Sequence, residues 1–410
     1  MVETKNPVYD CAGICTQSIH ADSHLRVTSD VSPPITVSTT YEYAQSDINA
    51  NNYGLDQRYV YGREAQPTVT KVEAVLSTVT EGHAVIYSSG LAAALAVLVQ
   101  YKPKKIAVSE CYFGIRKVIE QYQQLVPNVT VVGSECAYDG VDLVWIESPV
   151  NPTGEVKDIA GYALRAHAAG AILVVDATLA PPPISYPFRQ GADVVVNSAT
   201  KYLGGHSDLL AGVVVTRSNK TAEVLRSTRH VLGLNSGSLE GWLLIRSLRT
   251  LNIRVKQQSA TAARLVALIE TFRRNAVTTN CHKPSVDDLA LGRYITSVRH
   301  ATLQINGAHC NSNIAAQHPN GFGAVFAVSF ATKEQALFVA RHLRLHRFAT
   351  SLGSVESLVD WRHGWDVTAD STLLRISIGL ECYDDLAKDW RQALLALNEV
   401  ELKKTTVAKL

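Results

Sequence analysis

The chain has 410 residues, 46% of them hydrophobic, and its 39 basic and 37 acidic side chains give a formal net charge of +2. A chain of this length can bury a large core, and one large domain with a smaller one is the natural expectation. The balanced charge and the lack of a long basic run argue against nucleic acid as a partner. The most apolar run, residues 90–99, is too short to cross a bilayer, and residues 1–10 lack a secretory-signal pattern, so we expect a soluble chain.

The cysteines are odd in number and scattered, which predicts a reducing compartment with free, mostly buried thiols. They are Cys11, Cys15, Cys111, Cys136, Cys281, Cys310 and Cys382. The first two, with His20 and His24, could be drawn as a zinc site, but their spacing matches no standard finger. We therefore expect an irregular N-terminal arm and no metal.

Residues 1–60 are rich in Thr, Ser, Asn and Tyr and show no sustained periodicity. They are predicted to form an extended arm that reaches a partner subunit. From residue 68 the pattern changes, because valines and a leucine recur at helical spacing through residue 79.

Short apolar runs then alternate with helical segments as far as residue 217. The runs are 83–89, 105–110, 129–134, 143–149, 171–178, 192–200 and 211–217. Strands this uniformly apolar are buried on both faces, which predicts a parallel sheet covered by helices.

The chain becomes mainly helical from about residue 220, with long helical stretches through 238–272. A smaller α+β half follows, with strands at 323–331 and 373–380 and helices at 333–344 and 384–399. The predicted organisation is an arm over 1–60, a large α/β domain over 61–255 and a C-terminal α+β domain over 256–410.

Three chemical features follow predicted strands, where ligands bind in open α/β sheets. Ser88, Ser89 and Gly90 end a strand and open a helix, whose first N–H groups suit a phosphate. Asp176 ends a second buried strand, where a carboxylate needs a cationic partner. Lys201 follows a third, where a lysine loses its proton readily and can attack a carbonyl.

An anion site, an acid for a ring nitrogen and an amine are what pyridoxal phosphate requires. The alternative is that Asp176 and Lys201 form a structural salt bridge and nothing more. The hydroxyls of Ser198 and Thr200 beside the lysine favour the cofactor site.

Several motifs resemble those of the cystathionine γ-synthase/γ-lyase family, the Cys/Met-metabolism group of pyridoxal-phosphate enzymes. The segment VVVNSATKYLGGHSD at 194–208 is similar to that family's lysine signature nearly letter for letter. Further similar segments lie at 59–76, 87–95, 145–154, 174–182, 351–358 and 373–381. The resemblance implies a mostly parallel seven-stranded sheet of fold type I, as in aspartate aminotransferase, with a smaller C-terminal α+β domain.

The resemblance also implies roles in holding the cofactor. Lys201 would bond its aldehyde and carry protons, Asp176 would keep the ring nitrogen protonated, and Tyr112 would stack on the ring and act as an acid and base. The phosphate would be held by residues of two turns, Ser89, Gly90, Leu91, Ser198 and Thr200. Tyr112 could instead be an ordinary core aromatic.

Other implied contacts involve the substrate and a second subunit. Tyr61 and Arg63 would reach the phosphate of a neighbouring subunit in a homo-oligomer, a dimer of dimers, although both could be plain surface residues. Arg375 would clamp the substrate's α-carboxylate, assisted by Asn151 and the backbone near Ser351. Arg375 could instead pair with a structural acid.

The resemblance predicts γ-replacement on an activated L-homoserine, with γ- or β-elimination from cystathionine as the alternative. A catalytically silent paralogue is a third possibility, which the intact Lys201 and Asp176 disfavour. Methionine γ-lyases carry cysteine where this chain has Gly114, and bacterial-type β-lyases tend to carry tryptophan where it has Leu352. Phe113 replaces a glycine of the family.

The final residues Ala408, Lys409 and Leu410 resemble the S-K-L address of peroxisomal proteins. The alternative is a frayed helix end that finishes in leucine. The sequence therefore predicts a cytoplasmic or peroxisomal protein.

Overall fold

The fold is described from a computed structural model of the chain. The structure describes residue 9 and residues 11–26, 28–42, 59–277, 291–305 and 312–407. They divide into two compact units: a large unit of Met1–Ser148 with Asp158–Ile253, and a small unit of Pro149–Lys157 with Arg254–Leu410. The predicted C-terminal address and the cysteines at 281 and 310 lie outside the described residues.

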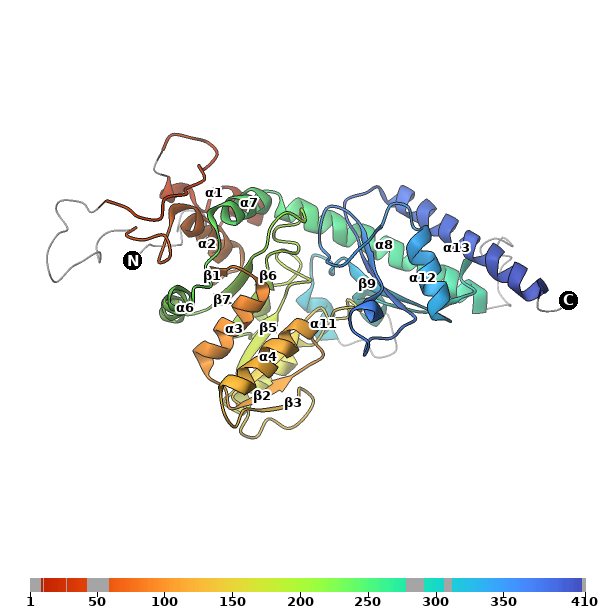
Figure 1. Ribbon diagram of the computed structural model, residues 1–410, viewed down its shortest axis with the longest axis horizontal. Coiled ribbons are helices and arrows are strands. Elements are labelled where there is room, and N and C mark those ends of the chain that lie inside the picture. Colours follow the sequence, from red (N-terminus) through yellow and green to blue (C-terminus); the bar gives the residue numbers. More distant parts are fainter. Residues whose placement is uncertain are drawn as a thin grey trace. The chain divides into compact units, whose positions relative to one another are not determined.

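The large unit is built on a seven-stranded sheet of order β1-β7-β6-β5-β4-β2-β3 (Figure 1). Its strands are β1 (His83–Tyr87), β2 (Lys105–Val108), β3 (Thr130–Gly133), β4 (Leu143–Glu147), β5 (Ile172–Asp176), β6 (Val194–Ser198) and β7 (Gly212–Thr216). The pairs from β3 to β6 are parallel, whereas β7 runs antiparallel to β1 and β6. Every residue of β4 and β7 is buried, as expected for strands covered on both faces. The mostly parallel sheet predicted from the apolar runs is confirmed.

Helices cover this sheet. They are α2 (Pro67–Val79), α3 (Gly90–Tyr101), α4 (Phe113–Leu125), α5 (Ile159–Ala168), α6 (Asn219–Leu232) and α7 (Ser238–Leu248). Apolar residues of α3, α4 and α6 form one core cluster with the strands. Several of these helices have a side-chain cap at their N-terminus. At the start of α6, for example, the Ser218 hydroxyl accepts from the Thr221 amide.

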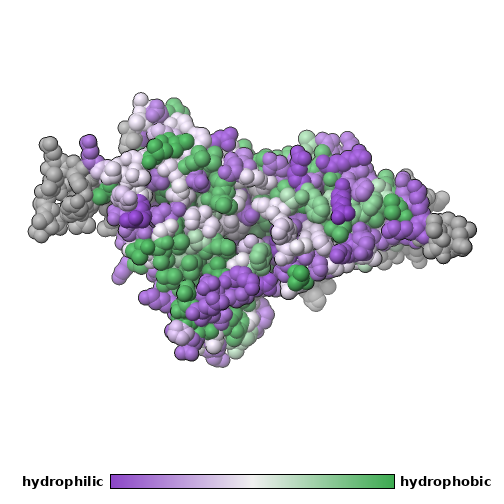
Figure 2. All heavy atoms as spheres, viewed as in Figure 1, coloured by the Kyte–Doolittle hydropathy of each residue, from purple (hydrophilic) through white to green (hydrophobic). Residues whose placement is uncertain are grey.

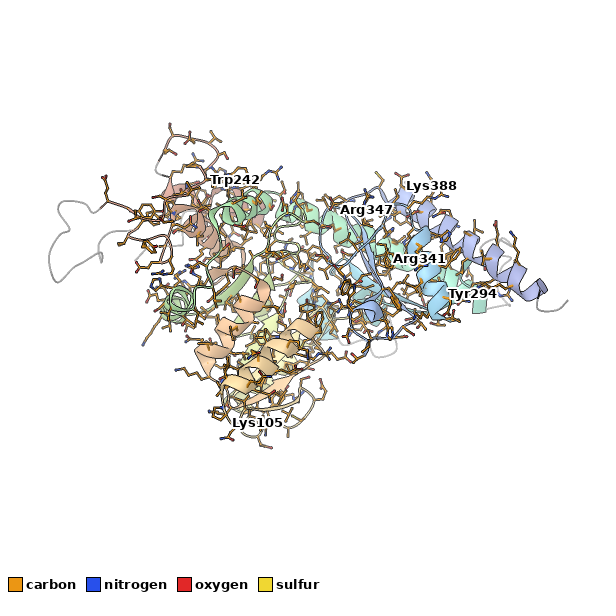
Figure 3. The ribbon with its side chains drawn as sticks, viewed as in Figure 1. Lys105, Trp242, Tyr294, Arg341, Arg347 and Lys388 are labelled. Atoms are coloured by element: carbon orange, nitrogen blue, oxygen red, sulfur yellow. The ribbon has the colours of Figure 1, made fainter. Side chains whose placement is uncertain are left out.

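The N-terminal segment is partly helical, so the predicted extended arm is wrong over α1 (Ile14–His20) and the 3₁₀ turn η2 (Ser23–Leu25). Arg249 fixes it by donating to the Ser18 carbonyl and to both carboxylate oxygens of Asp22. Farther along, the indole of Trp242 donates to the Pro33 carbonyl at 2.8 Å (Figure 3). Long-range polar contacts of this kind leave no periodic pattern in the sequence.

The prediction of mostly buried cysteines is also wrong. Cys11, Cys15 and Cys382 are exposed, Cys136 is half-buried and Cys111 is buried. All five are free thiols.

The small unit holds a five-stranded sheet of order β10-β11-β12-β9-β8. Its strands are β8 (Ile295–Arg299), β9 (Val325–Phe330), β10 (Arg347–Phe348), β11 (Leu358–Asp360) and β12 (Leu373–Ser377). Its helical segments are most of α8 (Leu251–Val277), α10 (Ala301–Ile305), α11 (Ser312–Gln317), α12 (Lys333–His342), η5 (Arg362–Gly364) and α13 (Tyr383–Val407). In the part of the chain described here, no helix is both long and apolar enough to span a membrane.

The nine residues Pro149–Lys157 join the small unit from the middle of the large unit's sequence. Gln304 exchanges two hydrogen bonds of 2.9 Å with the backbone of Val156. Gly154 has a φ of +71°, and a Cβ there would lie 1.9 Å from the Val325 carbonyl oxygen. Glycine is therefore required where this segment passes β9.

Candidate active site

The candidate site of the large unit lies at the carboxyl ends of the parallel strands. Glu147, the last residue of β4, is in register with Asp176, the last residue of β5. Asp176 in turn faces Val196, two residues before the end of β6. The topology thus brings the end of each strand to one edge of the sheet, where ligands bind in such folds.

Gly212 sets the two predicted phosphate-binding turns beside each other. It starts β7 and is in register with both Tyr87 of β1 and Ser198 of β6. A Cβ at Gly212 would lie 2.0 Å from the Ser89 carbonyl oxygen, and one at Gly90 would lie 3.0 Å from Ser198 Cβ. The absence of these side chains lets the two turns approach closely.

The turns that contain Ser89 and Ser198 together form a candidate anion cradle. Its hydrogen-bond donors are mainly backbone groups. The Ser89 hydroxyl caps α3 by accepting from the Ala92 amide at 3.1 Å. The amides of Gly90 and Leu91 are in the first turn of α3 and have no acceptor within the helix. They can therefore bind an anion, favoured by the helix dipole.

Thr200 is already engaged on the other side of the cradle. Its hydroxyl donates to the Ala211 carbonyl at 3.3 Å and accepts from the Ala211 amide at 3.1 Å. A hydroxyl carries one proton, so Thr200 must give up its donation before it can donate to a phosphate.

Asp176 is buried and is held by Thr178. The amide and hydroxyl of Thr178 both donate to Asp176 Oδ1, at 3.0 and 2.5 Å. The same hydroxyl accepts from the Ser198 amide at 2.8 Å, which links β5 to β6. Burial raises the pKa of Asp176, and the hydrogen bonds from Thr178 offset this only in part. A cation beside Asp176 would therefore be strongly stabilised.

Lys201 lies in the turn that follows β6. Its amide donates to the Ser198 carbonyl at 3.1 Å, and its carbonyl accepts from Gly205 at 2.6 Å. The side chain is half-buried. The sequence-predicted lysine and acid thus follow neighbouring parallel strands, as required for one site.

Tyr112 precedes α4, and its ring lies over Gly114. A Cβ at Gly114 would lie 2.4 Å from Tyr112 Cε1 and 3.0 Å from Leu91 Cδ2. The Phe113 ring makes an edge contact with the Tyr112 ring, with centroids 4.7 Å apart. A cysteine in place of Gly114 would displace the tyrosine, so glycine here sets the ring's position.

The sequence prediction missed two residues, Glu147 and Thr178. The carboxylate of Glu147, 2% exposed, accepts from the Tyr112 amide at 2.5 Å and so fixes the start of α4. Both residues carry a recognisable signal. Glu147 is a carboxylate that ends an apolar strand, and Thr178 lies two positions after such a carboxylate.

Tyr61 and Arg63 lie on a surface loop of the large unit. The Arg63 guanidinium stacks over the Tyr61 ring at 5.0 Å, and the ring side chain is partly exposed. Tyr61 forms an isolated bridge with Thr40, and Gly62 donates to the Thr39 carbonyl at 2.8 Å. The loop is thus held by the N-terminal segment.

The small unit brings together the three residues predicted to bind substrate. Arg375, 2% exposed, donates from Nη1 to Asn151 Oδ1 at 3.2 Å and from Nη2 to the Ser351 carbonyl at 2.7 Å. Ser351 has a φ of +79°, a strained value for a residue with a side chain. Arg375 also forms an ion pair with Asp360, so the alternative of a structural acid partner has a counterpart in the fold.

The large-unit residues fit the cofactor that the resemblance implies. The amides at the start of α3 suit a phosphate, and the glycines at 90 and 212 let the two turns lie close together. The buried acid at 176 suits a protonated ring nitrogen. Lys201 would supply the amine that bonds the aldehyde.

Comparison with known proteins places the chain in a family. Residues 15–395 match the family model described as Cys/Met metabolism PLP-dependent enzyme. A cystathionine γ-lyase of Saccharomyces cerevisiae is 31% identical over 92% of this chain and 96% of its own length. A cystathionine γ-synthase of Mycobacterium bovis is 30% identical over 96% of this chain and all of its own length.

The fold agrees with this match. The crystal structure of the yeast cystathionine γ-lyase superposes with a TM-score of 0.80 at 28% identity, over 94% of this chain and 98% of that one. The chain therefore belongs to the Cys/Met metabolism family of PLP-dependent enzymes, and its cofactor is pyridoxal phosphate.

Proposed function

We propose that this enzyme catalyses γ-replacement on an activated L-homoserine, joining its γ-carbon to a thiol or a similar nucleophile. The observation that carries the proposal is the cluster at the strand ends, where an amine, a buried acid and an anion cradle lie on neighbouring elements. The similarity to a γ-synthase over the whole chain supports it.

Residues of the large unit hold the cofactor. The amides of Gly90 and Leu91 bind its phosphate, together with Ser89, Ser198 and Thr200. Asp176 keeps the ring nitrogen protonated, and Thr178 holds that carboxylate in place. When bound, pyridoxal phosphate accepts the electrons released as the substrate's α-proton leaves.

Proton transfer is assigned to Lys201 and Tyr112. Lys201 would hold the cofactor through its Nζ, and the same amine, when free, would remove the substrate's α-proton. Positioning this amine can supply about 7–11 kcal/mol of the barrier reduction. The Tyr112 ring, placed by Gly114 and Glu147, stacks on the cofactor and takes part in acid–base chemistry.

Arg375 binds the α-carboxylate of the substrate. Its contacts to Asn151 and to the strained carbonyl of Ser351 fix the orientation of the guanidinium. A fixed guanidinium fork favours a bidentate carboxylate and loses little side-chain entropy on binding.

The residues at two positions, one in each unit, favour chemistry at the γ-carbon of a homoserine ester or of cystathionine. Gly114 stands where methionine γ-lyases carry cysteine, and the Tyr112 ring occupies the space of that side chain. Leu352, 3% exposed, stands where bacterial-type β-lyases tend to carry tryptophan. Elimination from cystathionine is the second candidate, supported by the match to a γ-lyase.

Product analysis separates the two reactions. The purified holoenzyme is incubated with O-acetylhomoserine and cysteine, with related homoserine esters, and with cystathionine alone, and products are identified by mass spectrometry. A thioether amino acid indicates replacement, whereas a keto acid and ammonia from cystathionine indicate elimination. No product from any ester or thioether would contradict both.

We also propose a homo-oligomer, a dimer of dimers, in which Tyr61 and Arg63 complete the neighbouring subunit's phosphate site. Large apolar side chains are exposed on the large unit. They support the proposal that a second subunit covers part of its surface. They include Val31, Val37, Leu91, Leu210 and Val231. Apolar surface gathers over α3 and around α1 and α7 in Figure 2. Mixing inactive Lys201→Ala and Arg63→Ala proteins should restore partial activity if sites are shared, and none if each chain is self-sufficient.

We propose that the enzyme acts in the peroxisome if residues 408–410 are read as an address, and in the cytoplasm if they are not. Fluorescent fusions with and without this tripeptide distinguish the two. Loss of peroxisomal signal on deletion would support the address, whereas an unchanged cytoplasmic signal would exclude it.

A further inference from the structure

The loop that carries Tyr61 and Arg63 is held from two sides. On one side it contacts Thr39 and Thr40, which are themselves exposed. On the other side, Nδ2 of the Asn235 side chain donates to the Arg63 carbonyl. This second contact comes from the junction of α6 and α7, 172 positions farther along the chain. The position of the loop therefore depends on a side chain outside the site described above.

The chain on either side of this contact is anchored to the large unit. Gly233 ends α6 with a φ of +67°, the left-handed conformation that is typical of a helix C-terminus. The Leu234 amide then donates to the Arg229 carbonyl at 3.1 Å, and the Leu234 side chain packs against the core cluster of the sheet. Because Asn235 follows directly, its amide group has a firm base from which to hold a surface loop.

The same stretch also contacts the anion cradle of its own chain. The amide of Ser88, in the turn that leads into α3, donates to the Leu234 carbonyl at 3.0 Å. Leu234 thus holds a turn of its own cradle, whereas Asn235 holds the loop that is proposed to serve another subunit. The two contacts are adjacent in sequence but would act on different active sites.

We propose that Asn235 is a positioning residue for Arg63, and that it acts on the phosphate site of the neighbouring subunit rather than on that of its own chain. Its amide fixes the Arg63 backbone, so that the guanidinium, stacked over Tyr61, is presented in one orientation. The proposal rests on the proposed sharing of Tyr61 and Arg63 between subunits. It deepens that role by naming the side chain on which the position of the loop depends.

Cofactor retention by the holoenzyme is the first measurement. Asn235→Leu keeps the approximate shape of the side chain and removes the donor. On dialysis against graded concentrations of pyridoxal phosphate, followed by absorbance, the half-saturating concentration should rise about threefold to tenfold, the range expected for one hydrogen bond. Asn219→Leu is the matched control, because that exposed amide on α6 donates to Glu223 at 2.9 Å and should not affect retention.

The effect should depend on the phosphate group. Pyridoxal has the ring and the aldehyde of the cofactor but no phosphate. Its half-saturating concentration should change less than about twofold in Asn235→Leu. Equal weakening of both ligands would indicate a general disturbance of the large unit and would overturn the proposal.

Hybrid oligomers show on which subunit Asn235 acts. The chain that retains Lys201 carries an affinity tag and is expressed with an excess of an untagged partner, so that most tagged chains have an untagged neighbour. The absorbance band of the lysine-bound cofactor then reports only the tagged chain's site. Tagged Asn235→Leu with untagged Lys201→Ala should retain cofactor like the wild type, because the loop that serves its site comes from the neighbour.

The reciprocal hybrid should show the defect. Here the tagged chain is the wild type, and the untagged partner is the double variant Lys201→Ala/Asn235→Leu. The remaining site receives the altered loop, so its half-saturating concentration should rise about threefold to tenfold. If the defect stays with the tagged Asn235→Leu chain and is absent from the reciprocal hybrid, Asn235 acts on its own site and the proposal is overturned.

Folding of each variant is checked by thermal melting. If Asn235→Leu does not fold, Asn235→Asp takes its place, because an ionised carboxylate has nearly the same shape but no proton to donate. The same pattern in the two hybrids is expected of it. A change of less than about twofold in a folded Asn235 variant would also overturn the proposal.

Arg63→Ala in the same two hybrids separates this proposal from the one on which it rests. If Arg63→Ala weakens the neighbour's site and Asn235→Leu does not, the role of Asn235 is excluded and the shared site stands. If Arg63→Ala weakens the site of its own chain, the shared site and the role of Asn235 are both contradicted. These measurements record cofactor binding, so a wild type that converts no homoserine ester would contradict the proposed reaction alone.

Discussion

Two buried aspartates, one in each unit, have opposite electrostatic surroundings. Asp176 in the large unit is 6% exposed and is held by the amide and hydroxyl of Thr178. Asp360 in the small unit is 3% exposed and lies between the guanidinium groups of Arg362 and Arg375. Uncharged donors stabilise the first carboxylate, whereas two cations stabilise the second.

The two carboxylates differ in whether a positive charge already lies beside them. Burial raises the pKa of Asp176, so its cluster is completed by a cation, as a protonated ring nitrogen would be. The carboxylate of Asp360, by contrast, already lies within 3.6 Å of two guanidinium groups.

The largest expected effect comes from removing the amine of Lys201, which follows the strand paired with that of Asp176. Lys201→Ala should lower kcat/KM by roughly 10⁴-fold, because it loses both the covalent attachment and the proton carrier. The holoenzyme's visible absorbance band should also disappear. Lys105→Ala at the start of β2 (Figure 3) is the matched control and should retain activity. An active, coloured Lys201→Ala protein would contradict the assignment of Lys201 as the residue that holds the cofactor and carries protons.

Removing the charge of the acid should have the next largest effect. Asp176→Asn keeps the shape but removes the anion, and we expect kcat to fall about 10²–10³-fold with weaker cofactor retention. Dialysis followed by absorbance measures that retention. Asp139→Asn, at an exposed position, should behave like the wild type.

Thr178→Val tests the donors that hold the acid. Hydrogen bonds to a carboxylate lower its pKa, so their loss should raise the pKa of Asp176 further. If the ionised acid is required, activity should be lost at a higher pH as the solution is acidified. We expect the acidic limb of the kcat/KM profile to move upward, with about a tenfold loss near neutrality. Thr178→Ser keeps the hydroxyl, and an equal shift in that variant would contradict the assignment.

The smallest effect is expected at the glycine beneath Tyr112. Gly114→Ala would place a Cβ 2.4 Å from the tyrosine ring, so the ring must move. We expect a severalfold loss of kcat with little change in melting temperature. Gly133→Ala, where nothing lies within 4 Å, is the control. Full activity in Gly114→Ala would mean that the ring position is not critical.

Local pattern was sufficient to predict most of the large unit. Strands buried on both faces give continuous apolar runs, which identified the strands of this sheet other than β3. The residues of β3 are exposed or half-buried, and its apolar run comes from the edge of the sheet. A charged residue directly after such a run is costly to bury unless it has a polar or oppositely charged partner, and this identified Asp176 and Lys201 as site candidates. The same rule applied to β4 would have identified Glu147.

The rest depends on contacts that no local pattern carries. The pairing of Asp360 with Arg375 follows from the antiparallel register of β11 and β12, which is set by packing elsewhere in the sheet. The helix α1 is short and is fixed by Arg249 from a distant part of the chain. The buried-cysteine prediction relied on the average behaviour of the residue, which segments with few core contacts do not follow.

Pro149–Lys157 belongs to the small unit although it lies within the sequence of the large unit, and this has a consequence for the synthesis of the protein. Asn151 is 224 positions from the arginine that it binds, and Val156 is 148 positions from its Gln304 partner. During synthesis this segment leaves the ribosome long before those partners exist. The contacts of Arg375 with Asn151 and Ser351 can form only after β12 has emerged, and a fragment that begins at residue 254 would lack Asn151.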